Sequence, residues 1–220
     1  MSAKGWFVTG TDTGVGKTRA SAALLHALRA RHARCVGMKP VAAGTDASGV
    51  NEDVLALRAA GNVAVPPELD NPEALPDPVS PHIAAERAGR RIEVDTLVAA
   101  YRELACRADA VVVEGAGGFL VPLSAEATGG DLAVALGLPV ILVIGLRLGC
   151  LNHALLTQEA VRARGLALAG WIVNRLDPAM PEQEANLDFL HRRLDAPLLA
   201  DWPWQLGAEP ATLRFERLPD

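Results

Sequence analysis

The sequence predicts an α/β fold in which a mostly parallel β-sheet is flanked by helices. Short apolar runs alternate with helical patterns of about 10–15 residues, which is typical of βαβ units. The runs at 110–113 and 139–144 are continuously apolar, as expected for strands buried on both faces. A loop rich in glycine and threonine, at 10–18, separates the first apolar run from the first helical pattern. No repeat or linker divides the sequence, so we expect one domain over residues 1–220.

The individual elements follow from the same patterns, taken in chain order. Short apolar runs predict strands at 6–8, Cys35–Met38, 110–113, 139–144, 168–173 and 197–199. Helical periodicity predicts helices at 19–31, 51–60, Val94–Arg107, 131–136, 150–164 and 182–194. The many prolines of 62–81 predict a long surface excursion, and we expect 202–220 to be irregular.

Composition excludes several classes of protein. The formal net charge is −5, whereas a nucleic-acid-binding surface is basic. The longest apolar run, 138–144, is much shorter than the roughly 20 residues of a membrane-spanning helix. The three cysteines are scattered, without the spacing of a zinc site, and no secretory signal precedes the glycine-rich loop. We therefore expect a cytoplasmic protein with reduced thiols that binds neither nucleic acid nor membrane.

The glycine-rich loop GTDTGVGKT predicts a phosphate site of the P-loop NTPase type. Glycines let the backbone approach phosphate oxygens, and the following helix presents unpaired N–H groups to them. Lys17 supplies a positive charge, and the Thr18 hydroxyl suits Mg²⁺. Gly10 lies six residues before Gly16, one more than in the standard motif, so the loop is a variant. The alternative is a chance glycine turn.

Glu114 and Lys39 are expected at the ligand crevice, because the carboxyl ends of parallel strands line it. Glu114 directly follows the run 110–113 and begins a glycine-rich turn, where a carboxylate supplies a second Mg²⁺ contact. Lys39 ends the second strand and is placed to stabilise charge on a carbamate or a transferring phosphoryl group. The alternatives are a capping or surface glutamate and an exposed lysine before a turn.

Asp53 and Asn174 are weaker candidates from the residues alone. Asp53 lies in the first turn of a predicted helix, where the helix dipole favours an acid whether or not it binds metal. Asn174 ends the run 168–173, where an amide is suited to bind a nucleobase or simply to form a turn.

The motifs together closely resemble the dethiobiotin synthetase family. They are GTDTGVGKT, MKPVAAGT, VVVEGAGGFLVPL, LGCLNHALLT and GWIVN, in the family's order and spacing, from residue 7 to about 175. The segments APLL and PW near the C-terminus resemble the family's C-terminal nucleotide segment. The resemblance implies closure of a ureido ring on 7,8-diaminopelargonic acid with CO₂ or bicarbonate, ATP and Mg²⁺. The diamine forms a carbamate, which attacks the γ-phosphate to give a carbamic–phosphoric anhydride that the second amine closes.

The resemblance also implies roles for matching positions. Lys17 and Lys39 would be catalytic, and Thr18, Asp53 and Glu114 would hold Mg²⁺. Nucleotide contacts are implied for Thr13, Gly14, Val15, Gly16, Lys17, Thr18, Arg19, Asp53, Glu114, Gly115, Ala116, Gly117, Asn174, Arg175, Trp202, Pro203 and Trp204. Substrate contacts are implied for Thr11, Lys39, Ala43, Gly149, Cys150, Leu151 and Asn152. The family takes the helix start at 149–152, which receives the substrate's carboxylate tail, from the other subunit, so a homodimer is implied.

Three positions depart from the family pattern. Gly14 stands where many members have glutamate, which removes an acid near the amines. Ala43 stands where a hydroxyl residue is common, which removes a hydrogen bond to the substrate. Arg175 stands where the family often has an acid, which changes the ribose or base contact.

Two other functions share the loop chemistry. Partition-type switch ATPases have a variant loop with a second lysine five residues before the first, and Asp12 occupies that position here. Amidating synthetases of the cobyric-acid type usually carry a fused glutaminase domain, for which 220 residues leave no room.

Overall fold

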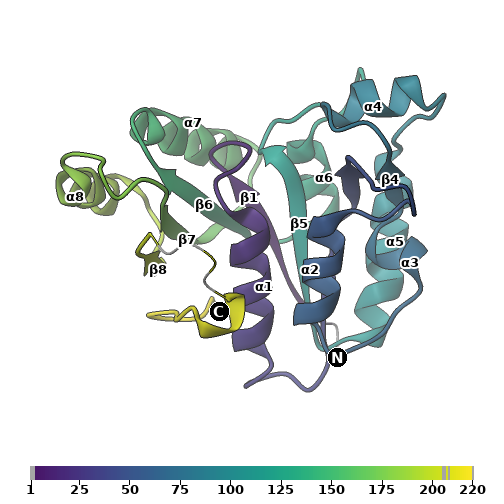
Figure 1. Ribbon diagram of the computed structural model, residues 1–220, viewed down its shortest axis with the longest axis horizontal. Helices are drawn as coiled ribbons and strands as arrows, with labels where there is room; N and C mark the ends of the chain where they lie inside the picture. The colour runs from purple at the N-terminus through teal and green to yellow at the C-terminus, as the bar shows by residue number, and fades with distance from the viewer. Residues whose placement is uncertain (1–2, 205–206, 208, 220) are drawn as a thin grey trace.

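A six-stranded parallel sheet forms the centre of the computed structural model, which describes residues 3–204, 207 and 209–219 (Figure 1). The strand order is β2-β5-β1-β6-β7-β8. The strands are β1 Lys4–Gly10, β2 Cys35–Met38, β5 Ala110–Gly118, β6 Val140–Leu146, β7 Leu168–Arg175 and β8 Leu198–Trp202. This order places β1, which leads into the glycine-rich loop, between β5 and β6 at the middle of the sheet. The predicted parallel α/β architecture is confirmed.

Helices cover both faces of the sheet, which explains why its central strands are apolar throughout. Val112 packs with α1 (Lys17–Leu28) and α2 (Glu52–Ala60), whereas its neighbours Val111 and Val113 pack with α5 on the opposite face. The helices of that second face are α5 Val94–Arg107, α6 Gly129–Leu136, α7 Cys150–Ala163 and α8 Gln183–Arg193. Among the described residues, no helix is long and apolar enough to span a membrane.

The proline-rich segment 62–81 differs from its prediction as a surface excursion. It contains α3 (Pro67–Asp70) and β4 (Glu73–Leu75), and α4 (Pro81–Arg87) begins at its end. Strand β4 pairs in parallel with β3 (Val41–Ala43), and Leu75 is fully buried. The prolines predict irregular structure, but α3 and α4 each have a proline in the first turn. A proline there costs no hydrogen bond, because a first-turn N–H has no partner within the helix.

Strand β5 is longer than the apolar run that predicts it. It continues through the glycines to Gly118, so the residues after Glu114 stay in the strand instead of ending it, although Gly117 has a positive φ of 55°. Val8 pairs with Glu114, and the register then shifts so that Gly10 pairs with Gly118. A side chain at Gly115 would lie only 3.0 Å from the Phe7 ring, so close packing, rather than a turn, accounts for that glycine.

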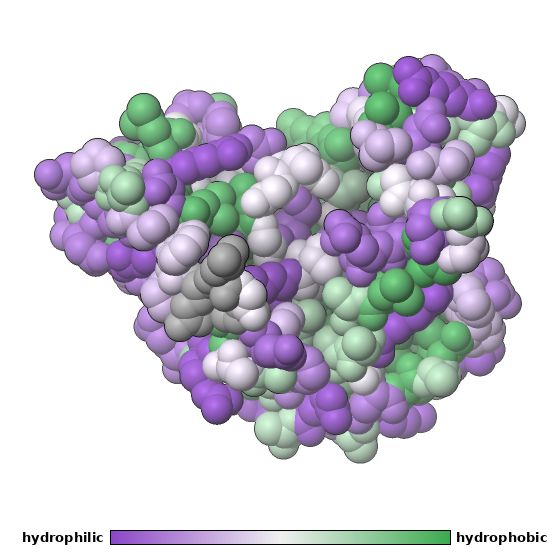
Figure 2. Space-filling model, in the orientation of Figure 1, coloured by the Kyte–Doolittle hydropathy of each residue, from purple (hydrophilic) through white to green (hydrophobic). Residues whose placement is uncertain are grey.

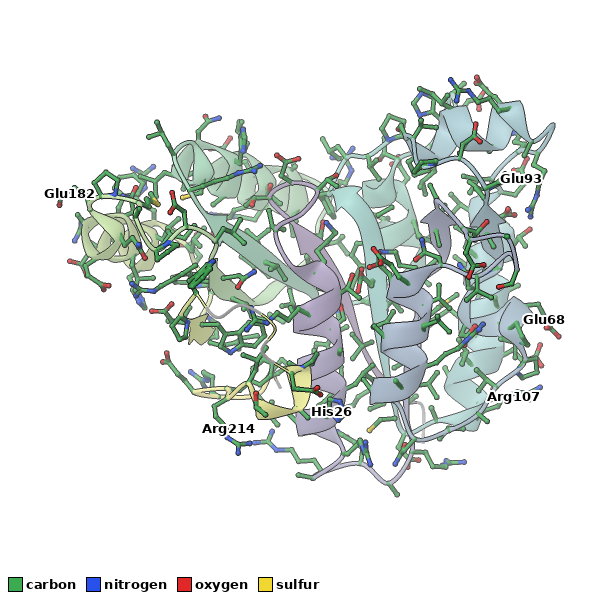
Figure 3. All side chains as sticks on the ribbon, in the orientation of Figure 1. His26, Glu68, Glu93, Arg107, Glu182 and Arg214 are labelled. Carbon is green, nitrogen blue, oxygen red and sulfur yellow. The ribbon has the colours of Figure 1, made fainter. Side chains whose placement is uncertain are left out.

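The C-terminal segment packs against α1. A short 3₁₀ helix, η1 (Pro210–Thr212), contacts α1, and Leu213 is buried in the same cluster as α1. Figure 3 shows His26 of α1 beside this segment, which also carries Arg214. Where it is described, the segment is irregular apart from η1, as predicted, but strand β8 extends to Trp202.

Candidate active site

The loop between β1 and α1 has the geometry of a phosphate site. Gly14 and Gly16 have positive φ angles of 74° and 92°, which favour glycine, and Gly16 is the N-cap of α1. The helix begins at Lys17, two residues before its predicted start at 19, so Lys17 and Thr18 form its first turn. Since that turn has no acidic residue, its N–H groups face the loop without a competing carboxylate.

Lys17 is held inside the loop by a backbone acceptor. Its Nζ donates a hydrogen bond of 2.9 Å to the carbonyl oxygen of Asp12. Burial, and then the charge of Lys39, lower the pKa of Lys17 to about 8. The carboxylate of Asp12 pairs with Arg147 at the end of β6, which ties the loop to the neighbouring strand.

Four side chains from four elements converge beside the loop. Lys39 Nζ lies 2.5 Å from Glu114 Oε1 and 2.9 Å from Asp53 Oδ2. Thr18 Oγ1 lies 2.8 Å from the same Glu114 oxygen and 2.7 Å from Asp53 Oδ1. Asn51 caps α2 by accepting a hydrogen bond from the backbone N–H of Asp53, which fixes the start of that helix. We call Thr18, Lys39, Asp53 and Glu114 the charge cluster.

The charge cluster favours the ionised forms of Lys39 and Asp53 although it is largely buried. Burial opposes the positive charge of Lys39, but the carboxylates of Glu114 and Asp53 outweigh it and raise the pKa of Lys39. Burial likewise opposes the charge of Asp53, but Lys39 and then the Thr18 hydroxyl hold the pKa of that carboxyl below its usual range. The cluster is therefore a preorganised set of opposite charges in a water-poor site.

The cluster also has donors suited to Mg²⁺. Glu114 is fully buried, and its Oε2 has no hydrogen-bond partner among the described residues. A buried carboxylate oxygen without a partner needs a cation or water. Within the described part of the chain no group of three or more His, Cys, Asp or Glu side chains forms a metal site. Mg²⁺ is usually bound through one or two carboxylates, water and substrate phosphates rather than a full protein cage.

A cavity of about 750 Å³ adjoins the charge cluster. Figure 2 shows the surface hollowed at its upper edge, between the lobe with α4 and the rest of the molecule. The predicted site residues that line the cavity are Thr13, Gly14, Gly16, Lys17, Thr18, Lys39, Ala43, Asp53, Glu114, Ala116 and Gly117. The cavity therefore joins the phosphate loop to Lys39 and Ala43, two of the residues from which substrate contacts are expected.

Other lining residues were not predicted. They include Asn51, Val121 and 78–81. The segment 78–81 was interpreted as part of a surface excursion, and only the position of α4 brings it over the cavity. Asn51 was detectable as an N-cap type residue before a helical pattern. Of the other predicted site residues, Thr11, Val15, Arg19, Gly115 and Asn174 are not in the cavity lining.

The expected base-binding residues lie at the ends of β7 and β8. Asn174 is buried, and its Nδ2 donates to the Val15 carbonyl at 3.0 Å. Arg175 pairs with Asp201 through two hydrogen bonds of 2.9 and 2.6 Å, and with Glu184 at 2.5 Å. These hydrogen bonds, from Asp201 first, raise the pKa of the Arg175 guanidinium. Arg175 therefore joins β7, β8 and α8.

The side chain of Trp202, which the resemblance implies lies near the base, packs into the core. Its indole is buried in the core, donates to the Arg214 carbonyl at 2.9 Å, and meets the Phe215 ring edge-on at 5.5 Å. A large aromatic ring is stabilised more by this burial than by an open position. Trp204 is 47% exposed, and Pro203 precedes it.

The start of α7 lies outside the cavity lining. Gly149 is the N-cap, with a φ of 95° and no side-chain cap. Cys150 is buried, Leu151 is half-buried and Asn152 is exposed, while the preceding Leu148 is 96% exposed. The structure therefore does not bring 149–152 to the charge cluster of the same chain.

Structural comparison shows the fold. Two similar structures are a ParA family ATPase from Chlorobium tepidum, with a TM-score of 0.56 and 16% identity, and the MinC:MinD complex of Aquifex aeolicus, with 0.58 and 15%. The first match covers 93% of this chain and 86% of the other, and the second covers 93% and 82%. The P-loop NTPase-like fold is thereby confirmed.

Sequence comparison shows the family. A model described as "AAA domain" matches residues 4–212. The ATP-dependent dethiobiotin synthetase BioD of Nitrosospira multiformis is 55% identical over 91% of this chain and 88% of its own length. The protein of the same name from Aromatoleum aromaticum is 52% identical over 98% of both chains. The expected resemblance is confirmed, and the chain belongs to the dethiobiotin synthetase family.

Proposed function

We propose that the protein is an ATP- and Mg²⁺-dependent cyclo-ligase that converts 7,8-diaminopelargonic acid and CO₂ to dethiobiotin, with release of ADP and phosphate. One observation carries the proposal beyond family membership. The phosphate loop and the charge cluster line one cavity of about 750 Å³, which has room for an organic substrate beside the triphosphate. Phosphoryl transfer depends mainly on positioning and electrostatic stabilisation, which this arrangement supplies.

The chemistry proceeds in three steps. An amine of the substrate attacks CO₂ and loses a proton, which gives a carbamate. A carbamate oxygen attacks the γ-phosphorus of ATP, the bond to the β–γ bridging oxygen breaks, and ADP leaves. The second amine then attacks the carbonyl carbon of the mixed anhydride, so that phosphate leaves with the C–O bond electrons and the cyclic urea forms. In each step, negative charge develops on the carbamate or γ-phosphate oxygens.

Lys39 is proposed to stabilise that charge. Its ammonium lies at the cavity wall, and its raised pKa keeps it protonated at neutral pH. It is held by Glu114 and Asp53, so little reorganisation is needed when the carbamate and the transferring phosphoryl group arrive. The hydrogen bond of Lys17 to the Asp12 carbonyl is exchangeable for one to a phosphate oxygen.

Mg²⁺ would be held by Thr18, Asp53 and Glu114, and it would neutralise phosphate charge during transfer. The Glu114 oxygen without a partner supports this assignment. The remaining loop residues bind phosphate oxygens through backbone N–H groups, as implied for 13–18.

The departures from the family pattern change the amine side of the cavity. Gly14 has a φ of 74° and no atom within 4 Å of the position of an added side chain, so the cavity is open where many members have a glutamate. Ala43 presents a methyl group to the cavity in place of a hydroxyl. Amine recognition therefore rests on the backbone and on the charge cluster.

The tail carboxylate of the substrate is proposed to bind the start of α7 in a partner subunit. The N-cap region of α7 is open, Asn152 is exposed, and neither lines the cavity of its own chain. Leu148, 96% exposed, supports burial of this end of the helix in a homodimer.

Mixing two inactive variants tests this shared site. Lys39→Ala removes the ammonium of one site, and Asn152→Asp puts a negative charge beside the tail carboxylate. A mixed dimer regains one intact site if subunits share sites, so an equal mixture should recover about a quarter of wild-type activity. No recovery, with mixed dimers shown to form, would mean that each chain builds its own site.

The function is tested by phosphate release from Mg-ATP with and without 7,8-diaminopelargonate and bicarbonate. We expect release only when both are present, with one cyclic urea formed per phosphate. Release that ignores the diamine would favour a switch ATPase and would overturn the proposal. A cytoplasmic location and the absence of nucleic-acid partners stay predictions.

A further inference from the structure

One guanidinium near the phosphate loop lacks a carboxylate partner. Arg19 follows Thr18 in the first turn of α1, and it forms no ion pair within the described residues. Its Nε and Nη2 are buried without any hydrogen-bond partner there. Only Nη1 has a contact, a long one of 3.5 Å to Asn174 Oδ1. Burial lowers the pKa of this guanidinium, although it stays charged at any physiological pH.

The guanidinium groups of Arg58 and Arg175, by contrast, are paired with carboxylates. Arg58 forms two hydrogen bonds of 2.7 and 2.6 Å with Asp70, and Arg175 does the same with Asp201. Leaving buried donors without acceptors costs free energy, and the cost is larger for a charged group. An unpaired guanidinium at a binding loop is therefore poised for a ligand with acceptor atoms or a flat π face.

The geometry of the loop indicates which part of a nucleotide reaches Arg19. The cavity with Lys39 lies on one side of the loop, and neither Arg19 nor Asn174 lines it. Asn174 packs against the loop at Gly16, where an added side chain would lie 2.4 Å from its Nδ2. With the triphosphate in the loop and the organic substrate in the cavity, the nucleoside extends towards the side formed by Arg19 and Asn174.

The amide of Asn174 has a defined orientation on that side. Its Nδ2 donates to the Val15 carbonyl, so its Oδ1 is the atom that faces Arg19. Arg19 and Asn174 together offer a ligand the guanidinium N–H donors, the second N–H of the Asn174 amide and the amide oxygen. Arg175, the alternative cation, is engaged by Asp201 and Glu184.

We infer that the Arg19 side chain binds the nucleobase of ATP, beside Asn174, and adds to nucleotide affinity beyond what the phosphate loop provides. The inference rests on the proposed use of ATP. A planar guanidinium either donates to ring nitrogen or oxygen atoms or stacks on the base, and both contacts need the base and not the phosphates. Arg19 is thus a residue that sets affinity for the nucleoside.

The test compares a ligand with a base and a ligand without one. Dissociation constants for Mg-ATP and for Mg-tripolyphosphate are measured by calorimetry on wild type, Arg19→Met and Arg29→Met. Arg29 is an exposed arginine at the other end of α1, so its variant matches the charge change. We expect Arg19→Met to weaken ATP about tenfold, as for one charged hydrogen bond. Tripolyphosphate on this variant, and both ligands on Arg29→Met, should stay within about twofold.

Two results would overturn the inference. One is unchanged ATP affinity in Arg19→Met, and the other is an equal loss for both ligands, which would assign Arg19 to the phosphates. Arg19→Lys keeps the charge but loses the planar fork, and it should recover only part of the affinity. Removal of an unpaired buried cation should not lower the melting temperature. A fall in melting temperature with unchanged ATP affinity would assign Arg19 to the fold.

The same experiment separates this inference from the proposed function. Wild-type protein that fails to bind Mg-ATP would overturn the proposed function. Wild-type protein that binds Mg-ATP and needs the diamine for turnover, with Arg19→Met binding equally well, would overturn only the assignment of Arg19.

Discussion

The two ends of the proposed nucleotide site are built differently. On the reaction side, Lys39, Asp53, Glu114 and Thr18 come from four elements and satisfy one another within 2.5–2.9 Å. On the base side, the charged groups either tie secondary structure together, as Arg175 does, or lack a partner, as with two nitrogens of Arg19. The reaction side is ordered by its own opposite charges, with one Glu114 oxygen left for a cation or water, whereas the proposed base side leaves two Arg19 nitrogens without an acceptor among the described residues.

The position of each side in the sheet accounts for the difference. In the charge cluster, Glu114 lies within β5, beside β1, and Lys39 lies just after the end of β2, where helices cover both faces and packing fixes the backbone. The base side lies at β7 and β8 near the sheet edge, where the C-terminal segment completes the core. The charge cluster is therefore held by the central strands β5 and β1 together with the edge strand β2, whereas the base side lies on β7 and the opposite edge strand β8.

Lys39→Ala is the strongest test of the reaction side. We expect ring closure to fall by at least about 10²–10³-fold, as for loss of one preorganised donor, with ATP binding largely kept. The variant leaves Asp53 and Glu114 without their cation, so its melting temperature should fall, and Mg²⁺ should raise it more than in wild type. Lys4→Ala, an exposed lysine on β1, is the control. Normal turnover by Lys39→Ala would contradict the role proposed for this lysine.

Asp53→Asn tests whether the cluster holds a metal. Loss of one carboxylate charge should raise the Mg²⁺ concentration for half-maximal activity by at least about tenfold. A Mg²⁺ titration of initial rates measures the effect, and Glu68→Gln, on the exposed side of α3, controls for net charge. An unchanged Mg²⁺ requirement with a reduced maximal rate would limit Asp53 to holding Lys39.

The pKa of Lys17 predicts a pH dependence of phosphate binding. Its value of about 8 in the free protein lies below the ordinary 10.5, so the ammonium loses its proton as pH rises through 8. Phosphates bind the charged form, so the dissociation constant of Mg-ATP should rise about fivefold between pH 8 and 9. Calorimetry at pH 8 in buffers of different ionisation enthalpy should show proton uptake. Lys17→Met should bind weakly at all pH values without this slope.

In the ligand-free protein the lowered pKa of Lys17 makes stability rise with pH, whereas ATP binding weakens as pH rises. Between about pH 8 and 10.5 the unfolded chain keeps a proton that folded Lys17 has lost. The contribution of Lys17 to the free energy of unfolding therefore rises with pH in this window. Denaturant titrations of wild type and Lys17→Met across the window measure it.

Arg175→Met should have the smallest effect. It removes a half-buried ion pair that joins β7 to β8, so the free energy of unfolding should fall by about 1 kcal/mol. ATP affinity should change by less than about twofold, because the guanidinium is already engaged by two carboxylates. Urea unfolding measures the free energy of unfolding, and calorimetry measures the ATP affinity. A tenfold loss of ATP affinity would show instead that Arg175 contacts the nucleotide, as the family pattern implies.

The reaction side was largely predictable because its residues stand next to strong local patterns. Lys17 and Thr18 follow a glycine loop, and Lys39 and Glu114 follow apolar strands whose carboxyl ends share an edge. The metal-binding role of Asp53 was harder to predict, because the helix dipole favours an acidic residue in the first turn whether or not that residue binds a metal. Only the structure shows that Asp53 Oδ2 reaches Lys39 at 2.9 Å.

The rest depends on contacts between distant segments. The prolines of 62–81 gave no sign of the pairing of β4 with β3, because a three-residue strand is defined by its partner. The two tryptophans of the C-terminal segment look alike in sequence, yet Trp202 is buried and Trp204 is 47% exposed. The partner of Trp202 is Phe215, whose approach depends on the path of the C-terminal segment along α1.

The small sheet of β3 and β4 gives the cavity an outer wall that is separate from the main sheet. The backbone of Lys39 anchors this wall, since its N–H donates to the Asp70 carbonyl at 2.8 Å and its carbonyl accepts from Asn71 at 2.7 Å. Residues 78–81 complete the wall. The shape of the substrate chamber can therefore diverge among relatives, or be redesigned, by exchanging a peripheral insert while the catalytic strands stay fixed.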